Sequence, residues 1–120
     1  MTPKEMQHRT RQLALRIVRL AASFPRTRIG DVFARQLVRC GTSVAANYRS
    51  ACRARSHTEF VARMGVVEEE ADETVFWVEL AAEAGLVRHQ RVEGLLTEAQ
   101  EIVAIVTASR KTAKIRHRRG

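Results

Sequence analysis

The chain has 120 residues, of which 45% are hydrophobic and only 5% are aromatic. This length provides one domain with an aliphatic core, and it is too short for two domains. The 21 Lys and Arg residues outnumber the 13 Asp and Glu residues and leave a net charge of +8. Such a charge favours contact with nucleic acid, an anionic membrane or an acidic partner, and it does not choose among them.

The N-terminal segment and the cysteines indicate the compartment. The first ten residues, MTPKEMQHRT, are polar and lack the apolar segment of a signal peptide. No apolar run approaches the length that crosses a bilayer. Cys40 and Cys52 follow no metal-ligand or redox spacing, so we expect reduced, buried thiols rather than a disulfide. These features predict a cytoplasmic protein.

Apolar residues recur at helical spacing in four segments. Thr2 and Pro3 mark the start of the first segment as an N-cap and a first helical position, and Pro25 ends it. Gly85 ends the third segment as a C-cap residue. The predicted helices cover residues 3–23, 29–54, 57–84 and 89–112. This pattern predicts an all-α fold, an antiparallel up-and-down four-helix bundle, with residues 1–120 as a single domain.

Positive charge concentrates in the first half of the chain and at the end of the fourth helix. Residues 1–60 hold 12 basic and 3 acidic residues, whereas residues 61–120 hold 9 and 10. Residues 111–120 are predicted to be a basic tail that is frayed or disordered. The candidate nucleic-acid-binding residues are Arg16, Arg19, Arg49, Arg53, Arg55, Arg110, Lys111, Lys114, Arg116, Arg118 and Arg119. We expect them to contact phosphates rather than to read bases.

Two residues of the second predicted helix have expected structural roles. Gly41 interrupts the apolar stripe, and we expect a bend or a close helix–helix approach there, because Gly costs about 1 kcal/mol against Ala inside a helix. Asn47 lies beside the stripe. A structural hydrogen bond to a neighbouring helix is preferred to a ligand-binding role for Asn47, since most buried polar side chains are simply satisfied ones.

The third predicted helix has two apolar faces. Ser56 and Glu59 stand at capping-box spacing, with Ser56 as the N-cap and Glu59 in the first turn, and they set its start. One face follows the core stripe, and the other carries large side chains that point away from it. A second stripe of this kind indicates self-association, with acids on the same side that arginines of a partner chain would neutralise. The candidate oligomer-interface residues are Val66, Glu69, Glu73, Phe76, Trp77 and Leu80.

The sequence contains no arrangement of residues that indicates catalysis. A di-metal centre in a helical bundle needs Glu-x-x-His pairs, and no acid stands three residues before any of the four histidines. There is no Gly-rich phosphate loop and no nucleophile elbow. We therefore expect no enzymatic activity, no cofactor and no metal site.

The segment from Gln36 to Leu80 resembles a known family. It reads QLVRCGTSVAANYRSACRARSHTEFVARMGVVEEEADETVFWVEL, and it resembles the four-helix bundle proteins also called 23S rRNA intervening-sequence proteins. Many members have Glu-Gly shortly after the Asn and a Pro before it, whereas this chain has Arg49 and Ser50 after Asn47 and Ala45 and Ala46 before it. The matching positions are Gln36, Thr42, Ser43, Asn47, Arg55, Ser56, Glu59, Phe60, Glu70, Asp72, Glu73 and Trp77.

This resemblance implies an assembly and partners that the residue pattern does not supply. It implies a cytoplasmic homo-oligomer, with a ring of five bundles as the characteristic assembly. Related accessory proteins of diversity-generating retroelements are basic pentamers that bind nucleic acid and a reverse transcriptase. The net charge of +8 and the acid-free basic segments lead to the main hypothesis, a non-enzymatic, homo-oligomeric protein that binds RNA or DNA or has an accessory role. The alternative is a structural or scaffold oligomer whose charges mainly serve subunit interfaces.

Overall fold

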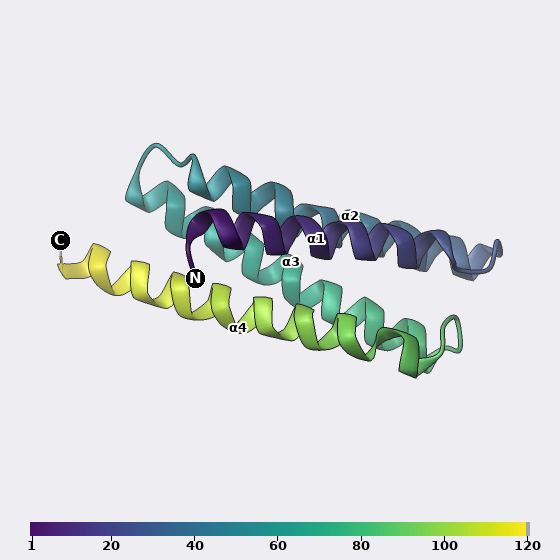
Figure 1. The fold of residues 1–120 in the computed structure, drawn as a ribbon. Coiled ribbons are helices and arrows are strands. Elements are labelled where there is room, and N and C mark those ends of the chain that lie inside the picture. The colour runs from purple at the N-terminus through teal and green to yellow at the C-terminus, as the bar shows by residue number, and fades with distance from the viewer. Residues whose placement is uncertain (120) are drawn as a thin grey trace.

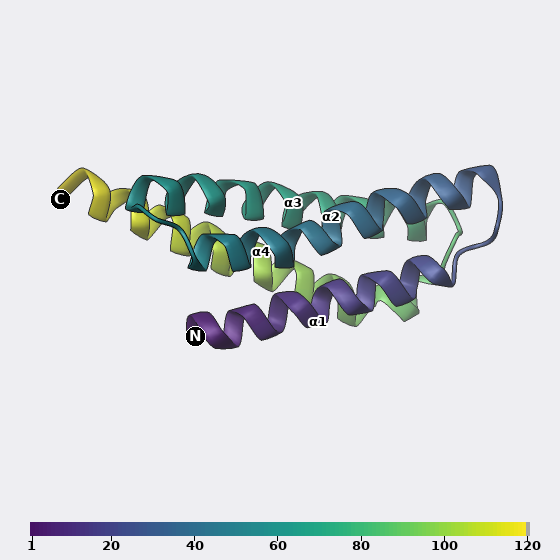
Figure 2. The same cartoon turned by 90° about the horizontal axis from the view of Figure 1, so that it is seen from above.

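The computed structural model describes the backbone of residues 1–119 and the side chains of residues 1–116. Within that range the chain forms the α-helices α1 (Pro3–Ala22), α2 (Arg28–Cys52), α3 (His57–Glu83) and α4 (His89–Arg119). Each helix runs back alongside the one before it, so the directions alternate along the 51 Å axis of the molecule (Figure 1 and Figure 2). The predicted all-α, antiparallel up-and-down four-helix bundle is confirmed.

The predicted apolar stripes form one aliphatic core. Among the larger side chains, Leu13, Ile17, Leu37, Met64 and Ile102 are fully buried. The two polar residues buried among them are satisfied within their own helices. The hydroxyl of Thr10 donates to the Met6 carbonyl at 3.0 Å, and that of Thr74 donates to the Glu70 carbonyl at 2.8 Å. These bonds remove the cost of burying a hydroxyl without a partner.

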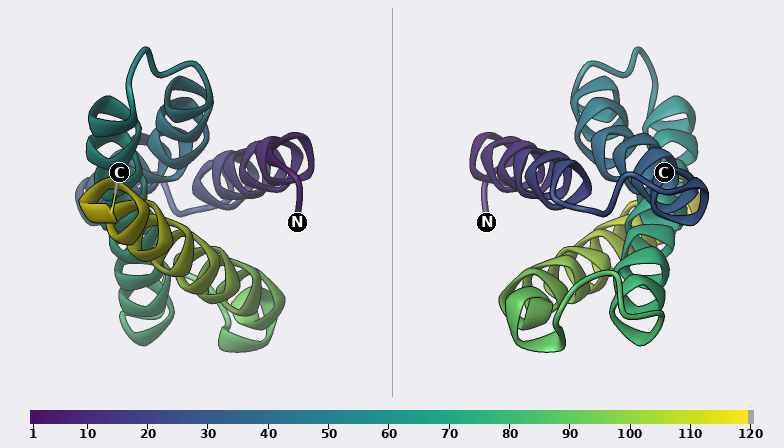
Figure 3. Two further views of the ribbon diagram at one scale, coloured as in Figure 1. Left: turned by 90° about the vertical axis from the view of Figure 1, so that its left-hand side faces the viewer. Right: turned by 90° about the vertical axis from the view of Figure 1, so that its right-hand side faces the viewer.

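The bundle is open between α1 and α4. Helices α1, α2, α3 and α4 pack extensively in sequence, whereas α1 contacts α4 only weakly. Figure 3 shows α1 standing apart from α4 at the end of the bundle where both termini lie. Arg9 links the two helices there: its Nε donates to Glu98 Oε2 at 3.0 Å, and its Nη2 contacts Glu98 and Glu101. The hydrogen bond and charge of Glu98 raise the pKa of the Arg9 guanidinium.

Side-chain caps begin the first three helices. Thr2 and Glu5 form a reciprocal capping box at α1. Thr27 Oγ1 accepts a bond from the Gly30 N–H at the start of α2. Ser56 Oγ accepts from the Glu59 N–H at 3.0 Å, as the sequence predicts for α3. In a complete capping box the Glu59 carboxylate would also accept a hydrogen bond from the Ser56 N–H. Here it accepts from the Arg55 N–H instead.

Helix α4 extends beyond its predicted end. It continues to Arg119, whereas the composition predicted an end at 112 and a frayed or disordered tail at 111–120. The described part of this segment is therefore helical. Ala113 is buried, and its carbonyl lies 2.7 Å from His57 Nε2 at the start of α3. Lys and Arg are also good helix formers, so a basic composition does not end a helix that still has a packing contact.

Helices α1 and α2 approach each other closely at Gly41. A Cβ atom at this position would lie 2.7 Å from Ile17 Cγ2 and 3.0 Å from Ile17 Cβ. Helix α2 runs through Gly41 without interruption. Of the two expectations for this glycine, a bend or a close approach, the structure contains the close approach.

Replacing Gly41 by Ala should therefore destabilise the fold. Overpacking against Ile17 costs about 1–3 kcal/mol, which outweighs the gain of about 1 kcal/mol in helix propensity. We expect the free energy of unfolding to fall by roughly 1 kcal/mol or more, measured by urea denaturation followed by circular dichroism.

Gly94→Ala is the matched control. A Cβ at Gly94 would meet only Arg16 Nη2, at 3.6 Å. The same change should stabilise α4 by about 0.5–1 kcal/mol, because only the propensity gain remains. Equal stabilisation by both substitutions would contradict the tight approach at Gly41.

Candidate nucleic-acid interface

A groove between α1 and α2 collects cationic side chains at the end of the bundle where α1 begins and α2 ends. His8 and Arg11 line it from α1, and Arg49 and Arg53 line it from α2. In each pair the residues are about one helical turn apart, so both side chains lie on the same face of their helix. Small and apolar residues line the space between the pairs, including Ala14, Ala45 and Ala46. We call this surface the basic groove.

The charges of the basic groove are not neutralised. All four of its cationic or imidazole side chains are exposed, and no acidic residue of the described chain lines the groove. Within the part of the chain that the structure describes, Arg11, Arg49 and Arg53 form no ion pair. A guanidinium presents a planar fork of donors that fits a phosphate group. The groove therefore offers three such forks to an anionic ligand.

Sequence reasoning identified half of this groove. Arg49 and Arg53 were predicted as candidates because they lie in an acid-free stretch, and the structure brings them together. Arg11 and His8 were missed as candidates. The basic character of the first helix was visible in the sequence, but the side of that helix that borders α2 depends on packing.

Arg16 and Arg19 lie in a different place. They line a shallow pocket between α1 and α4, together with Arg91 from the first turns of α4. Arg91 was not predicted as a candidate. The structure therefore separates the predicted arginines of α1 from those of α2 and makes two cationic surfaces.

The end of α4 contains both engaged and free cations. Arg110 Nη1 donates to Glu68 Oε2 at 3.3 Å, and the guanidinium covers Gly65, where a Cβ would lie 3.1 Å from Arg110 Nε. Arg110 was predicted as a nucleic-acid-binding residue, but it holds α3 against α4, so its guanidinium is not available to bind a phosphate. The predicted side chains that remain exposed nearby are Arg55, Lys111, Lys114 and Arg116. Arg118 and Arg119 belong to α4, but their side chains lie outside the described residues.

The second apolar face predicted for α3 is present. Val66 and Phe76 are exposed, and Leu80 is half-buried. Trp77 is partly buried, with its ring edge-to-face against both Phe33 and Phe76 at centroid distances of 5.3 Å. The exposed Phe76 ring is thus supported by a neighbour that is itself packed on α2.

The two acids predicted for this face differ in their surroundings. Glu73 accepts hydrogen bonds from Trp77 Nε1 at 3.3 Å and from Arg39 Nη2, and Arg39 also contacts Glu70 at 3.2 Å. The arginine that neutralises Glu73 in this structure comes from its own chain, whereas we expected one from a partner chain. Glu69 is exposed and has no ion pair within the described residues.

Asn47 satisfies its amide within its own helix. Its Nδ2 donates to the Ser43 carbonyl at 3.0 Å and to Ser43 Oγ at 2.8 Å. The predicted partner on a neighbouring helix is therefore replaced by a local one. Asn47 is half-buried at the α2 surface and stays a structural residue.

The cysteines and acids provide no metal centre in the described part of the chain. No group of three His, Cys, Asp or Glu residues is placed to hold an ion there.

Cys40 is buried, which raises the pKa of its thiol. Cys52 is exposed, so the expectation of two buried thiols is wrong for this residue, because it lies on the last turn of α2 beyond the core. None of the helices described is long and apolar enough to cross a membrane.

Four antiparallel helices with an aliphatic core and unpaired arginine surfaces define a small basic protein of the helical-bundle class. The chain matches the family model of the 23S rRNA-intervening sequence proteins over residues 4–108, and it belongs to this family. The resemblance predicted from Gln36 to Leu80 is confirmed.

A solved structure has the same fold. It is described as a protein with unknown function from the S23 ribosomal protein family of Bacteroides thetaiotaomicron. It is similar to this chain with a TM-score of 0.85 and 27% sequence identity, over 92% of this chain and 99% of that chain. None of the curated proteins matches this chain.

Substitution should lower the stability of the protein at Arg110 but not at its neighbour Lys111. Arg110→Gln removes the contact with Glu68 between α3 and α4, and we expect the free energy of unfolding to fall by about 1 kcal/mol. Lys111→Gln removes an exposed charge and should leave stability within about 0.5 kcal/mol of the wild type. Urea denaturation of both variants measures the difference. Equal stabilities would contradict a structural role for Arg110.

Proposed function

We propose that this protein is a non-enzymatic, homo-oligomeric accessory protein of the cytoplasm that binds RNA or DNA through phosphate contacts. The observation that carries the proposal is the basic groove. Arg11, Arg49 and Arg53 stand there with no acid beside them and no ion pair within the described chain. Arg9, Arg39 and Arg110 of the described chain are paired with glutamates, whereas these three arginines gather in one groove that no acid lines.

The arrangement favours backbone contacts over base recognition. Single-stranded bases are usually held on exposed aromatic rings next to the cations. Here Phe76 is the one exposed aromatic among the described side chains, and it lies on acidic α3 rather than in the basic groove. We therefore propose binding with little sequence preference and with a strong dependence on salt, since phosphate neutralisation releases counterions.

Oligomerisation would strengthen this binding. Each chain carries a net charge of +8, so five copies, the number that the family resemblance implies, would carry about +40. Several basic grooves on one assembly would contact one nucleic acid together, and weak individual contacts would add. The family resemblance also makes a reverse transcriptase the protein partner to test first.

The Arg49→Glu, Arg53→Glu variant tests the basic groove. We expect its affinity for a labelled RNA or DNA to fall at least tenfold, and the slope of log affinity against log salt to become shallower. Fluorescence anisotropy titrations at about 50 mM and 200 mM salt measure both quantities.

Arg28→Glu, Arg88→Glu is the matched control. It changes the net charge by the same amount at exposed arginines near the opposite end of the bundle. Its affinity should fall less than that of the groove variant. An equal loss would indicate a response to net charge alone, and no binding by the wild type at 50 mM salt would end the nucleic-acid proposal.

A second candidate is a structural or scaffold oligomer that binds no nucleic acid. The acids of α3 support it, because Glu69, Asp72, Glu79 and Glu83 are exposed and form no ion pair within the described chain. In this case the unpaired charges serve contacts between copies. Sedimentation of the Glu69→Ala, Asp72→Ala variant would then change, while anisotropy would detect no nucleic-acid complex for any variant.

A further inference from the structure

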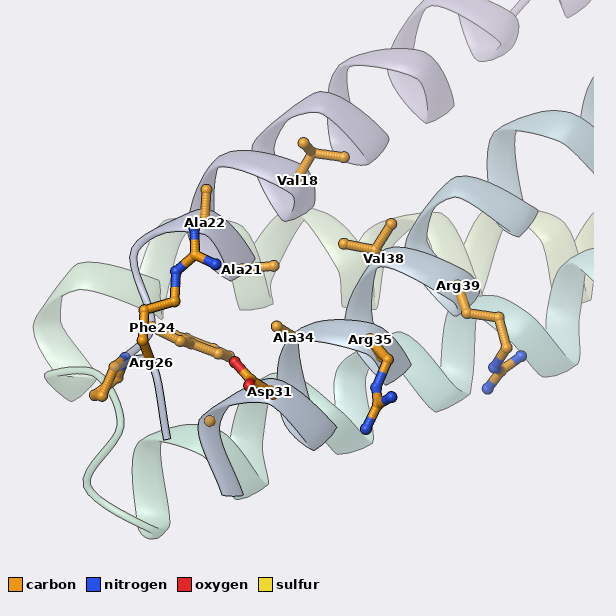
Figure 4. A pocket seen from close by; sticks show the side chains of 12 residues that line it. Val18, Ala21, Ala22, Phe24, Arg26, Asp31, Ala34, Arg35, Val38 and Arg39 are labelled. Atoms are coloured by element: carbon orange, nitrogen blue, oxygen red, sulfur yellow. The ribbon is translucent and has the colours of Figure 1, made fainter. Parts of the chain in front are cut away.

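The surface between α1 and α2 also contains an apolar groove, at the end of the bundle where α1 turns into α2. Val18 and Ala21 line it from α1, Ala34 and Val38 line it from α2, and Phe24 lies in the turn (Figure 4). Its volume is about 510 Å³, within the range of roughly 300–1,000 Å³ that encloses a small ligand. There is room for an aromatic side chain and its neighbours. We call this surface the apolar groove.

Arginines stand at the edge of the apolar groove. Arg26, Arg35 and Arg39 border it with a single acid, Asp31. Figure 4 shows the side chains of Arg35 and Arg39 extending outward from α2. Arg39 is engaged by Glu70 and Glu73. Within the described residues Arg26 and Arg35 form no ion pair.

The outer face of α3 has the opposite charge around an apolar centre. Phe76 is 52% exposed, and it is held edge-to-face on Trp77. Helical spacing places Asp72 and Glu79 one turn away on either side of Phe76, and Glu69 and Glu83 two turns away on the same face. All four acids are exposed. We call this surface the Phe76 face.

We propose that the Phe76 face of one copy docks into the apolar groove of a second copy. This inference rests on the homo-oligomer proposed above and names the two surfaces that meet. Apolar area supplies the attraction, because an exposed aromatic ring and an exposed valine-lined groove both leave water on contact. The acids around Phe76 then face Arg26 and Arg35 across the boundary, which fixes the orientation.

Charge argues against the symmetric alternatives. Pairing two Phe76 faces would bring eight unpaired carboxylates to one interface, and pairing two apolar grooves would bring the arginines of both copies together. Like charges in contact cost several kcal/mol. Contact between unlike surfaces avoids this cost. Such a contact leaves one face free on each copy, so it builds a ring if the rotation closes and an open chain if it does not.

The docked arrangement leaves the basic groove on the surface. The apolar groove and the basic groove share Val18 and continue along the same two helices, but the arginines and His8 of the basic groove belong to the opposite end. Each copy in the assembly would therefore still present its own phosphate-binding residues.

Two variants, each changed on one surface only, test the proposal. Phe76→Ser alters the Phe76 face, and Val38→Glu places a negative charge in the apolar groove. Both positions are exposed in the single chain, Val38 by 37%, so each variant should keep its helical circular dichroism spectrum. We expect each variant alone to be monomeric by light scattering and sedimentation at concentrations where the wild type is an oligomer.

An equimolar mixture of the two variants distinguishes this contact from all symmetric ones. The Phe76→Ser variant retains an unaltered apolar groove, and the Val38→Glu variant retains an unaltered Phe76 face. One intact contact can therefore form between one copy of each variant. The mixture should therefore contain dimers, with one copy of each variant, and no larger species. A mixture that stays monomeric, or a Val38→Glu variant that remains an oligomer, would overturn the proposal.

A control and a charge exchange complete the experiment. Ile115→Ser removes an exposed apolar side chain from α4, with an exposed fraction close to that of Val38, and should leave the oligomer unchanged. Arg26→Glu with Arg35→Glu should weaken the assembly at least tenfold, and adding Asp72→Lys with Glu79→Lys to the same chain should restore it. Failure of that rescue would contradict the pairing of these surfaces.

A monomeric wild type would refute the proposed oligomer itself, whereas an oligomer that none of the variants affects would refute only this assignment.

Discussion

The close approach of α1 to α2 at Gly41 is the constraint on which the surface of this protein depends. With no side chain at Gly41, Ile17 packs directly onto the backbone of α2. The two helices then lie side by side, and small residues such as Ala34 and Ala45 leave two grooves between them that share Val18. One groove is apolar and the other is basic. A larger residue at position 41 would push the helices apart and alter both grooves together.

Ion pairing divides the charges of the protein into two sets. Arg9, Arg39 and Arg110 join neighbouring helices by contacting glutamates, so their role is to hold the bundle in register. Among these three arginines, Arg9 has the most important position. It joins α1 to α4, which pack against each other less than the other neighbouring helices do. The remaining exposed charges gather by sign, with arginines along α1 and α2 and acids on the outside of α3. Both proposals use residues of this second set that form no ion pair within the described chain.

The sequence predicted the fold in detail because helical periodicity is a local property. The stripe of α1 from Met6 to Leu20, the cap at Thr2 and the stop at Gly85 each depend on residues within a few turns of one another. The errors arose where a distant contact decided the outcome. Helix α4 continues past 112 because Ala113 packs near His57, more than fifty positions earlier in the chain. Asn47 is the exception, because its amide bonds Ser43 one turn earlier in the same helix rather than a neighbouring helix. Glu73 meets Arg39, which no spacing rule connects to it.

The sequence by itself determined the helices, their alternating directions, the aliphatic core and the second apolar face of α3. It also identified an excess of arginine, but it did not sort those arginines by role. Only the tertiary structure decided that Arg110 is engaged, that Arg16 and Arg49 belong to separate surfaces, and that Arg11 stands beside Arg49 and Arg53. The physical reason is that the helical repeat fixes only the direction in which each side chain points from the axis of its own helix. The rotation of one helix against another is set by packing between residues far apart in the chain, such as Ile17 and Gly41.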